Sequence, residues 1–459
     1  MTTPAAGLFK AYDIRGVVDT DLTPDAVRQI GRAVGAEARA RGQHTIAIGR
    51  DGRLSGPGLA AALAEGLQAS GVDVTDIGVC ATPMLYFAVH HLGLGGGVMV
   101  TGSHNPPQYN GLKMVLAGET LSGEAIQSLR RRIEDGEFGA TPATTGAYSV
   151  AAVRAAYLER IVKDIKLTRP LHIVIDCGNG SPGATAPELF RRLGCTVTEL
   201  FCEVDGTFPN HHPDPSDPHN LEDLIRELGR GKGDIGLAFD GDGDRLGVVT
   251  RCGQIIYPDR QLMLFAADVL GRNPGSEIIF DVKCTRHLFD WITKHGGRPT
   301  LWKTGHSLIK AKMKATGALL AGEMSGHMFF KERWYGFDDG LYAGARLLEI
   351  LSQAEDLDAV FDALPDSVNT PEMQIRVEGR DHHALIAQLQ REATFPAARE
   401  VITLDGLRVE YTDGFGLVRG SNTTPVLVLR FEADDADALA RIQAEFRTVL
   451  AAVGVAAGF

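Results

Sequence analysis

The chain has 459 residues, of which 44% are hydrophobic and 23% are charged, and this balance excludes a disordered or a fibrous protein. At about 150 residues per domain, the length corresponds to roughly three domains. With 46 basic and 58 acidic residues, the formal net charge is −12. The chain therefore offers nucleic acid no general electrostatic attraction, and an anionic ligand must be held by a local basic cluster.

Six cysteines are spread along the chain without a C-x-x-C pattern. We interpret them as reduced thiols of a cytoplasmic protein, not as a disulfide framework or a zinc site. The opening sequence MTTPAAGLFKAYDIRG lacks a basic segment followed by an apolar one, so no signal peptide is expected. No run of about 18 apolar residues occurs, so we predict no membrane span and no membrane partner.

An apolar strand, a tight turn and an amphipathic helix recur three times in the chain. The strands are expected at 45–52, 171–180 and 277–285, and each helix ends near a glycine and leads into a second strand. This alternation is typical of parallel strands joined by helices. It predicts three similar α/β domains with mixed sheets, at residues 1–150, 151–253 and 254–366.

The C-terminal part follows a different pattern. After a connection at 364–375, a helix is expected at 381–393, then several strands between 398 and 433, and a last helix at 435–454. Strands and helices mixed in this way predict a small α+β domain at residues 367–459.

The first of four unusual polar loops contains Ser103, in the segment TGSHNPP after an apolar strand. Its prolines and glycine favour a fixed, non-helical loop, and a hydroxyl on a rigid loop can carry a covalent group. A non-functional Asx or ST turn is the alternative for a lone Ser-His-Asn. A serine hydrolase is not indicated, because the G-x-S-x-G pattern is absent from this loop.

The second loop, DGDGDR, lies between two apolar strands. Asp240, Asp242 and Asp244 alternate, so they share one side of an extended segment, and the intervening glycines let the backbone curl toward one centre. Three crowded carboxylates favour a hard cation such as Mg²⁺. An EF-hand is excluded, because Arg245 and Arg251 stand where that loop needs Gly and Glu. The remaining alternative is a solvated acidic turn.

The third loop, GEMSGH, places Glu323, Ser325 and His327 at alternate positions. They share one side if the segment is extended. A carboxylate, a hydroxyl and an imidazole in this array suit a substrate rich in hydroxyls.

The fourth loop, RGSNTTP, lies between two strands. A guanidinium fork with hydroxyl, amide and backbone N–H donors suits a phosphate dianion, whereas a polar hairpin turn is the alternative. The donors are Arg419, Ser421, Asn422, Thr423 and Thr424.

A dinucleotide site is a competing hypothesis, because Gly178–Gly183 matches G-x-G-x-x-G between a strand and a helix, with Glu199 about 20 residues on. It would make the protein a nicotinamide-dependent dehydrogenase. The match lies in the second of three similar units, however, and it leaves DGDGDR and the Ser103 loop unexplained. We therefore read these glycines as a tight turn between strand and helix.

A zinc site is a weaker alternative, at His211, His212 and His219 of the segment PNHHPDPSDPHN. Four prolines and the absence of helical i, i+4 spacing favour an ordered, extended loop instead.

Taken together and in this order, the loops resemble those of the α-D-phosphohexomutase superfamily, and most of all those of the bacterial phosphomannomutase/phosphoglucomutase enzymes. The resemblance covers essentially the whole chain, and no motif position departs from the family pattern. It is carried by FKAYDIRG (9–16), TGSHNPP (101–107), DGDGDR (240–245), DVKCTR (281–286), WKTGHS (302–307), GEMSGH (322–327) and RGSNTTP (419–425).

The resemblance implies four domains around a central cleft, with Ser103 as the phosphoserine. It implies one Mg²⁺ per chain, bound by Asp240, Asp242 and Asp244 together with Ser103. Glu323 and Ser325 would contact sugar hydroxyls, and Arg419, Ser421, Asn422 and Thr423 would bind the substrate phosphate. The remaining cleft residues would be Arg15, His104, Lys113, Arg245 and His306 with catalytic functions, and Tyr12, Lys283 and His327 with substrate contacts.

The reaction implied is the interconversion of hexose 1-phosphate and hexose 6-phosphate through a 1,6-bisphosphate, which is also the activator. Lys113 is the expected general acid/base, with His104 and His306 as alternatives, and Arg245 would stabilise the equatorial phosphoryl oxygens. The expected partner is a small sugar phosphate and the expected state a monomer. The sequence leaves open whether glucose phosphate or mannose phosphate is the preferred substrate. A phosphoglucosamine mutase and a non-catalytic sugar-phosphate binding protein remain as alternative functions.

Overall fold

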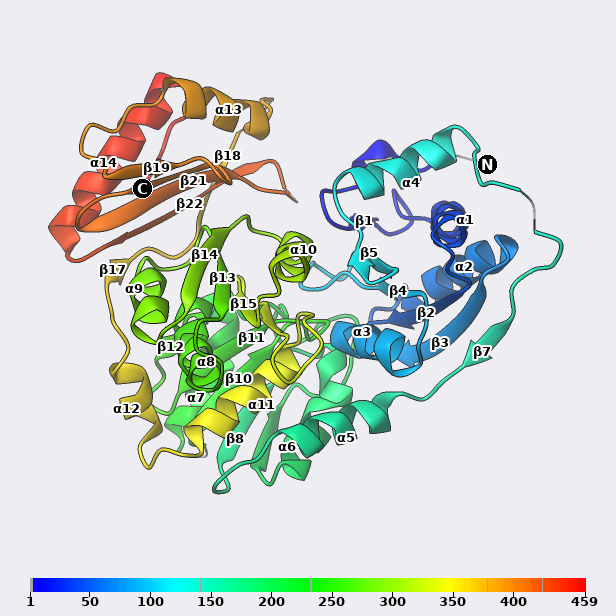
Figure 1. The fold of residues 1–459 in the computed structure, drawn as a ribbon, viewed down its shortest axis with the longest axis horizontal. Coiled ribbons are helices and arrows are strands. Elements are labelled where there is room, and N and C mark those ends of the chain that lie inside the picture. Colours follow the sequence, from blue (N-terminus) through cyan, green and yellow to red (C-terminus); the bar gives the residue numbers. More distant parts are fainter. Residues whose placement is uncertain (1–2, 141, 232, 378, 423) are drawn as a thin grey trace.

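Four β-sheets follow one another along the chain, and we call the parts that carry them domains I to IV (Figure 1). The structure is a computed structural model that describes residues 3–140, 142–231, 233–377, 379–422 and 424–459. The expected α/β organisation of the first three domains and the α+β organisation of the fourth are confirmed.

The sheet of domain I is mixed. Its centre is parallel, because β2 pairs with β3 and β4 through crossover helices, while β1 and β5 are antiparallel additions. Its strand order is β1 (Ile14–Val17), β5 (Tyr109–Leu116), β4 (Gly96–Val100), β2 (Thr45–Arg50), β3 (Asp73–Val79) and β7 (Tyr148–Val150), with β6 (Glu119–Thr120) beside β5. Its helices are α1 (Pro24–Ala40), α2 (Gly56–Ala69), α3 (Thr82–His91) and α4 (Glu124–Glu134).

Domains II and III repeat the plan with smaller mixed sheets. In domain II the order is β12 (Ile255–Ile256), β11 (Leu246–Thr250), β10 (Ile235–Phe239), β8 (His172–Asp176) and β9 (Thr196–Leu200). In domain III it is β14 (Arg298–Trp302), β13 (Glu277–Asp281), β15 (Leu320–Gly322) and β16 (Met328–Phe330). The helices are α5 (Arg154–Asp164), α6 (Ala186–Arg192), α7 (Glu222–Gly229), α8 (Pro258–Arg272), α9 (His287–Lys294), α10 (His306–Thr316), α11 (Gly340–Leu351) and α12 (Leu357–Asp362). The second sheet extends to Ile256 through β12, three residues beyond the expected domain boundary at 253. The expected domain boundaries as such stay predictions.

Domain IV is an antiparallel sheet with two helices, α13 (His382–Glu392) and α14 (Ala436–Ala452). Its strands are β17 (Val368–Asn369), β22 (Val426–Ala433), β21 (Gly414–Gly420), β20 (Leu407–Glu410) and β19 (Glu400–Ile402), with β18 (Met373–Arg376) also beside β22. Two strands also precede the first helix, because β17 and most of β18 lie within 364–375, a segment for which the sequence predicted no strand. Pro365 and Pro371 flank these short strands and hide the alternation that would have indicated them.

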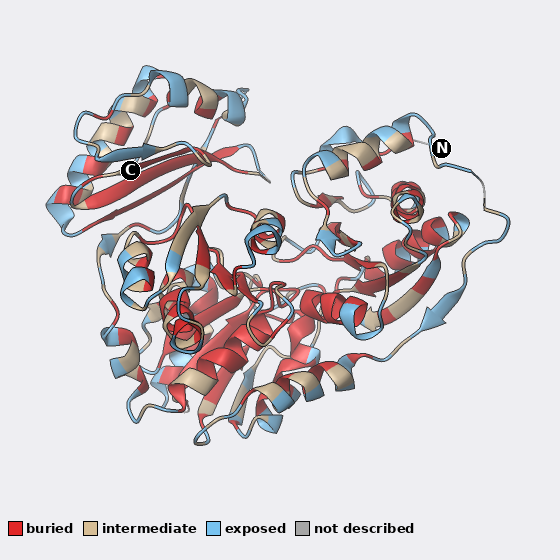
Figure 2. Cartoon of the chain, in the orientation of Figure 1, coloured by how far each residue is buried: buried red, intermediate tan, exposed pale blue. Residues whose placement is uncertain are grey.

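The hydrophobic core is divided unequally. One cluster of buried side chains extends from Ala47 to Leu364 and joins domains I, II and III, whereas domain IV has its own cluster from Val377 to Val455 (Figure 2). Among the described residues, the apolar cluster that connects domains III and IV is small, with Val282, Phe415 and Leu417 buried in it. Among the described residues, no helix has both the length and the apolar surface that crossing a bilayer would require.

Candidate active site

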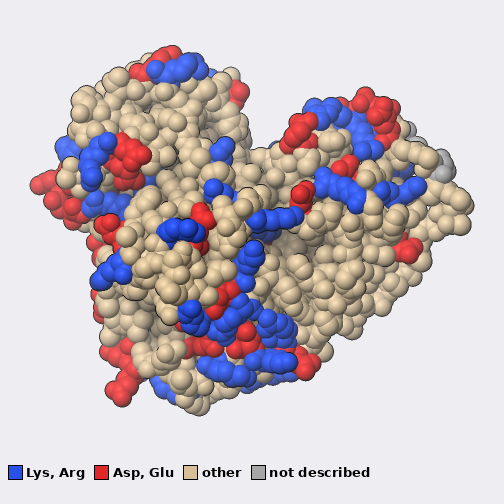
Figure 3. Space-filling model, viewed as in Figure 1, with Lys and Arg blue, Asp and Glu red and all other residues tan. Residues whose placement is uncertain are grey.

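A cavity of about 1070 Å³ lies where the four domains meet, and each domain contributes to its wall. Figure 3 shows the molecule notched between domains I and IV. The predicted site residues that line the cavity are Tyr12, Arg15, Ser103, His104, Lys113, Arg245, Lys283, His306, Glu323, Ser325, His327, Arg419, Ser421 and Asn422. Thr423 lies outside the described residues, and the three aspartates lie just beneath the wall, fully buried.

Ser103 lies in the loop between β4 and β5. Its side chain is 1% exposed and its backbone has a φ of 50°, a left-handed conformation that is uncommon for a residue other than glycine. Its N–H donates to Oγ1 of Thr101 at 2.8 Å, and its own Oγ donates to Oδ2 of Asp240 at 2.9 Å. The hydroxyl of domain I thus contacts the acidic loop of domain II directly.

The acidic loop joins β10 to β11 as a tight turn, in which the backbone curls toward one centre. The N–H groups of Asp244 and Arg245 both donate to Oδ1 of Asp240, and Gly243 has a φ of 74°. A Cβ at Gly241 would lie 2.5 Å from the carbonyl oxygen of Ser103, so only glycine fits there. The curl, which the glycines permit, is what brings the three carboxylates together.

The acidic loop has the chemistry of a metal site. Oxygens of Asp240, Asp242 and Asp244 lie within 4.8 Å of one another. Oδ1 of Asp242 and Oδ1 of Asp244 are buried and have no hydrogen-bond partner among the described residues. Burial, with Asp244 and Asp242 nearby, raises the pKa of Asp240 well above its ordinary value. Buried, crowded and partly unsatisfied carboxylate oxygens fit a hard divalent cation.

Lys113 lies on β5 and faces this cluster. Its Nζ donates to Oδ2 of Asp242 at 2.8 Å and to Oδ2 of Asp244 at 2.5 Å. Burial alone would lower the pKa of Lys113, but the attraction of these carboxylates outweighs it and raises the pKa. Lys113 is therefore a cation here.

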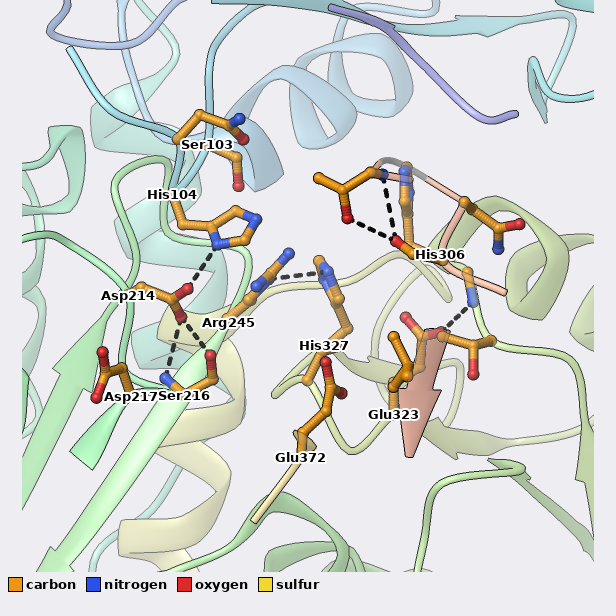
Figure 4. Close-up of a pocket in the computed structure, with 18 of the residues that line it drawn as sticks. Ser103, His104, Asp214, Ser216, Asp217, Arg245, His306, Glu323, His327 and Glu372 are labelled. Atoms are coloured by element: carbon orange, nitrogen blue, oxygen red, sulfur yellow. Dashed lines mark hydrogen bonds and ion pairs between the residues drawn. The ribbon is translucent and has the colours of Figure 1, made fainter. Parts of the chain in front are cut away.

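His104 forms a pair with Asp214 from domain II (Figure 4). Nδ1 of His104 lies 2.6 Å from Oδ2 of Asp214, which also accepts hydrogen bonds from the N–H and Oγ of Ser216 through Oδ1. Burial, assisted by Arg245, lowers the pKa of His104 to about 4, so the imidazole is neutral at pH 7. Because a carboxylate only accepts, we assign the proton to Nδ1, which leaves Nε2 as a proton acceptor.

His327 and His306 lie against each other on the domain III side, with ring centroids 5.7 Å apart. Nε of Arg245 donates to Nε2 of His327 at 3.1 Å, and Nδ1 of His327 lies 3.1 Å from Oδ2 of Asp338. The other oxygen of Asp338 accepts from Lys310 at 2.8 Å. Burial, together with the charge of Lys310, lowers the pKa of His306 well below its ordinary value, so this imidazole is neutral too.

The expected sugar-reading residues lie in the turn between β15 and β16. The segment is not extended, since the N–H of Glu323 donates to the carbonyl of His327 at 2.9 Å and Gly326 has a φ of 103°. Glu323 and Ser325 nevertheless face the same cavity. Burial raises the pKa of Glu323 to about 7, and its carboxylate accepts a hydrogen bond from the N–H of Gly305.

The expected phosphate-binding residues lie on domain IV. Arg419 is at the end of β21, where its Nε donates to Asp405 at 3.1 Å, and its Nη2 is buried without a partner among the described residues. The same oxygen of Asp405 accepts from the N–H of Thr304 in domain III at 2.9 Å. On the domain III side, Nζ of Lys283 donates to Glu372 at 2.8 Å. Arg419 is 4% exposed. Its guanidinium is therefore bound by Asp405 through Nε, while Nη2 has no partner among the described residues.

Arg15 on β1 lies where the Ser103 loop meets the cavity. Its guanidinium donates to Asp13 at 2.5 Å and to Asn105. Tyr12 packs edge-on against His306, with ring centroids 5.5 Å apart. Tyr12 therefore links domain I to domain III at the cavity, whereas Arg15 bonds within domain I.

The two alternative sites are not supported. The glycine-rich turn at Gly178–Gly183 packs against the acidic loop, where a Cβ at Gly180 would lie 2.8 Å from the backbone of Gly241. No room for a pyrophosphate remains at that contact. His211 bonds to Asp176 and His219 to Glu222, so two of the three histidines suggested for zinc have separate carboxylate partners.

Five site residues escaped the sequence analysis: Arg53, Asp214, Asp338, Glu372 and Asp405. Arg53 donates to the carbonyl groups of the Ser103 loop, and the four acidic residues orient His104, His327, Lys283 and Arg419. Asp214 lies in the histidine-rich segment and Asp338 beside Asp339, so an acidic residue in a polar loop was the only signal. None of the five lies within four residues of the group that it orients, which is why spacing does not reveal them.

Comparison with known proteins agrees with this geometry. Four successive segments match phosphoglucomutase/phosphomannomutase alpha/beta/alpha domain I (6–140), domain II (155–253), domain III (257–368) and the C-terminal domain (372–449). The chain is 59% identical to a phosphoglucomutase of Neisseria gonorrhoeae, over 98% of both chains. It is 57% identical to a phosphomannomutase/phosphoglucomutase of Pseudomonas aeruginosa, over 98% of this chain and 97% of that one.

A solved structure gives the same result. The crystal structure of a phosphoglucomutase/phosphomannomutase family protein from Burkholderia thailandensis is 57% identical and superposes with a TM-score of 0.94, covering 99% of this chain and 100% of that one. Together with the four matched domains, these similarities confirm the family that the loops resemble. The chain therefore belongs to the phosphoglucomutase/phosphomannomutase family of the α-D-phosphohexomutase superfamily, and it is a phosphohexomutase.

Proposed function

We propose that the enzyme interconverts the 1-phosphate and 6-phosphate of glucose and of mannose, with a phosphoserine at Ser103 and a hexose 1,6-bisphosphate as intermediate and activator. The observation that carries the proposal is the contact of the Ser103 hydroxyl with Asp240, at 2.9 Å, on one wall of a cavity whose other wall holds Arg419. A reacting phosphoryl group and a second, non-reacting one can be bound at the same time in such a cavity.

The three aspartates would hold one Mg²⁺, because the buried Oδ1 atoms of Asp242 and Asp244 have no partner among the described residues and suit a cation. Such an ion offsets the charge of a phosphoryl group and stabilises the serine oxygen as it leaves. Arg245 lies next to the acidic loop with its backbone N–H bonded to Asp240, which supports a function in stabilising the equatorial phosphoryl oxygens.

Proton transfer at the sugar hydroxyl needs a donor and an acceptor in the same cavity. Lys113, a cation beside Asp242 and Asp244, supports the donor function. The neutral imidazoles of His104 and His306 support the acceptor function, and a positioned group of this kind contributes about 10²–10⁴-fold in rate.

The grip on the non-reacting phosphate would come from domain IV. Arg419, whose buried Nη2 has no partner among the described residues, lines the cavity with Ser421 and Asn422, and Thr423 completes this group in the sequence. Because the bisphosphate must present each of its ends to Ser103 in turn, the same grip has to accept either phosphate. Glu323 and Ser325 would contact the sugar hydroxyls, with Tyr12, Lys283 and His327 around them.

The proposal includes both epimers, because the Pseudomonas aeruginosa relative is named for both phosphomannomutase and phosphoglucomutase. Phosphoglucosamine is the alternative substrate within the same family. We further propose a monomer in the cytoplasm, which the six free thiols support, since disulfides are rare in that compartment.

The test is a coupled assay with glucose 1-phosphate, mannose 1-phosphate and glucosamine 1-phosphate, each with and without a hexose 1,6-bisphosphate. Turnover of the first two, stimulated by the bisphosphate, is expected. Intact mass should also show a gain of about 80 Da, one phosphoryl group, that is absent from Ser103→Ala. Turnover of glucosamine 1-phosphate alone would assign the alternative substrate, and binding without turnover would leave only a sugar-phosphate binding protein.

A further inference from the structure

The loop that carries Ser103 is held by a single buried guanidinium, that of Arg53. Its Nη2 donates to the carbonyl oxygens of Ser103 at 2.8 Å and of Asn105 at 2.5 Å. Its Nη1 donates to the carbonyl oxygens of Pro106 at 2.6 Å and of Tyr109 at 2.9 Å. One side chain, fixed 50 positions earlier in the chain, thus collects four carbonyl groups of the loop.

The fifth donor of Arg53 is also used. Its Nε donates to Oδ2 of Asp51 at 3.1 Å, and the same carboxylate oxygen accepts from the N–H of Gly102 and the hydroxyl of Thr101. A guanidinium has five N–H donors in a fixed plane, and here each has a protein acceptor. No donor is therefore left for substrate, and the side chain, 1% exposed, does not line the cavity.

Arg53 is closely packed on two sides, by the Ser103 loop and by domain II. A Cβ at Gly102 would lie 2.4 Å from Cζ of Arg53, so the loop approaches as closely as glycine permits. Domain II covers the other side, where the ring of Phe208 lies 5.1 Å from Cζ and a Cβ at Gly206 would lie 2.7 Å from Cα of Arg53. Arg53 is thus enclosed at the interface of domains I and II.

Two physical consequences bear on Ser103. First, a φ of 50° is unfavourable for serine, so the surrounding contacts must stabilise this backbone conformation. The hydrogen bond from Arg53 to the carbonyl oxygen of Ser103 is one of these contacts. Second, a phosphoryl group on Ser103 would carry a charge of about −1.5 to −2, which carbonyl oxygens repel. The four carbonyl oxygens are instead directed to a cation.

We propose that Arg53 is a positioning residue for phosphoryl transfer, which fixes the Ser103 loop in the conformation that presents Oγ to the acidic loop. It acts through the backbone, without touching substrate. This inference rests on the proposed phosphoserine at Ser103. It predicts a loss in the chemical step and not in the binding of sugar phosphate, because the phosphate grip lies on domain IV.

The experiment compares Arg53→Met and Arg53→Lys with the wild-type enzyme. Methionine keeps much of the apolar stem and removes all donors, whereas lysine keeps the charge but has only three donors. We expect kcat, and the rate at which a hexose 1,6-bisphosphate loads Ser103 by intact mass, to fall by about 10²-fold in Arg53→Met, since a displacement of about 1 Å costs that much. Arg53→Lys should lie between, and KM should stay within about threefold.

A matched control is Arg346→Met. Arg346 is also fully buried and bonded, to Asp268 and Glu332, but it does not line the cavity or contact the Ser103 loop. It should lose thermal stability while the folded protein keeps its kcat. Gly102→Ala gives a second route, because its methyl group presses on the guanidinium without removing it, and it should lower kcat with KM unchanged.

The outcomes separate the two proposals. If wild-type enzyme gains no phosphoryl group, the phosphoserine proposal fails, whatever Arg53 does. If wild-type enzyme is loaded and folded Arg53→Met keeps kcat and loading within about threefold, or loses no more than Arg346→Met, the positioning function is overturned. If neither Arg53 variant folds and Gly102→Ala keeps its kcat, Arg53 serves the fold alone and the inference is overturned as well.

Discussion

The hydroxyl of Ser103 donates a hydrogen bond to Asp240 at 2.9 Å, although 137 positions separate the two residues in the chain. The bond crosses from domain I to domain II, and the backbone of Gly241 presses against the carbonyl of Ser103 at the same place. The reacting oxygen and the acidic cluster are therefore parts of one unit that forms only when the two domains are packed together.

Ser103→Ala should abolish mutase turnover, because the alcohol that would carry the phosphoryl group is gone. Residual activity should be below about 1% of the wild-type value, since the loss concerns a covalent step and not a contact. Coupled assays and intact mass measure both effects. Ser149→Ala, at the exposed strand β7, is the control and should behave as wild type. A variant without Ser103 that turns over at the normal rate would exclude it as the carrier.

Asp242→Asn should weaken the apparent affinity for Mg²⁺ by more than about tenfold and lower activity accordingly. The change removes a negative charge from a buried cluster in which Oδ1 of Asp242 has no partner among the described residues. Activity measured against free Mg²⁺, after treatment with a chelator, gives the affinity. Asp413→Asn, at a half-exposed position in domain IV, is the control. Full activity of the chelated wild-type enzyme would remove the metal from the reaction.

Arg419→Ala should raise KM for hexose 1-phosphate by about 10–100-fold, the range expected for one or two charge-assisted hydrogen bonds. The free Nη2 of this side chain is the basis for the expectation. Steady-state kinetics measure it, with Arg441→Ala as control, because Arg441 lies in the same domain but pairs with the half-exposed Asp413. Unchanged kcat/KM would contradict the phosphate grip.

Binding of the sugar should depend on pH through Glu323, whose pKa is raised to about 7 by burial. Above pH 7 the carboxylate accepts hydrogen bonds from sugar hydroxyls, and below pH 7 the protonated form accepts fewer. KM should therefore fall as pH rises from 6 to 8. Glu323→Gln should lack this component, and comparing the two enzymes with the same substrate removes the titration of the phosphate. Parallel profiles would exclude Glu323 as the group responsible.

Gly180→Ala should destabilise the protein and lower its activity, because the new methyl group would meet the backbone of the acidic loop. Thermal unfolding and the mutase assay measure this. Titration of the wild-type enzyme with NADH should leave the cofactor fluorescence unchanged, since the turn has no free space for a pyrophosphate. A saturable fluorescence change would revive the dehydrogenase hypothesis.

The loops of the site could be predicted from the sequence because they are polar, rich in glycine or proline, and bounded by apolar strands. TGSHNPP and DGDGDR therefore stand out without any structure, and so does their order in the chain. Their shape could not be predicted equally well. The glycines of Asp240–Asp244 indicated that this segment curls, but for Glu323–His327 alternation placed the side chains together only if the segment was extended, whereas local hydrogen bonds and a glycine with positive φ make it a turn.

The supporting residues could not be predicted, because each acts through a partner far away in the chain. Asp214 lies 110 positions from His104, and Arg53 lies 50 positions from Ser103. Four of the five donors of Arg53 bond to carbonyl groups, which leave no side-chain pattern to match, because any sequence supplies carbonyls. Such contacts follow from the packing of domains, which the spacing of residues does not encode.

Domain IV has its own hydrophobic core and meets domain III mainly through polar contacts, such as those of Arg408 with the carbonyl groups of Val282 and Cys284. Domain IV, which would bind the non-reacting phosphate, is thus a structurally separate unit that could be exchanged. Grafting the corresponding segment of a relative onto residues 1–366 is expected to yield a folded chimera that keeps the bond-making chemistry and takes its anion preference from the donor.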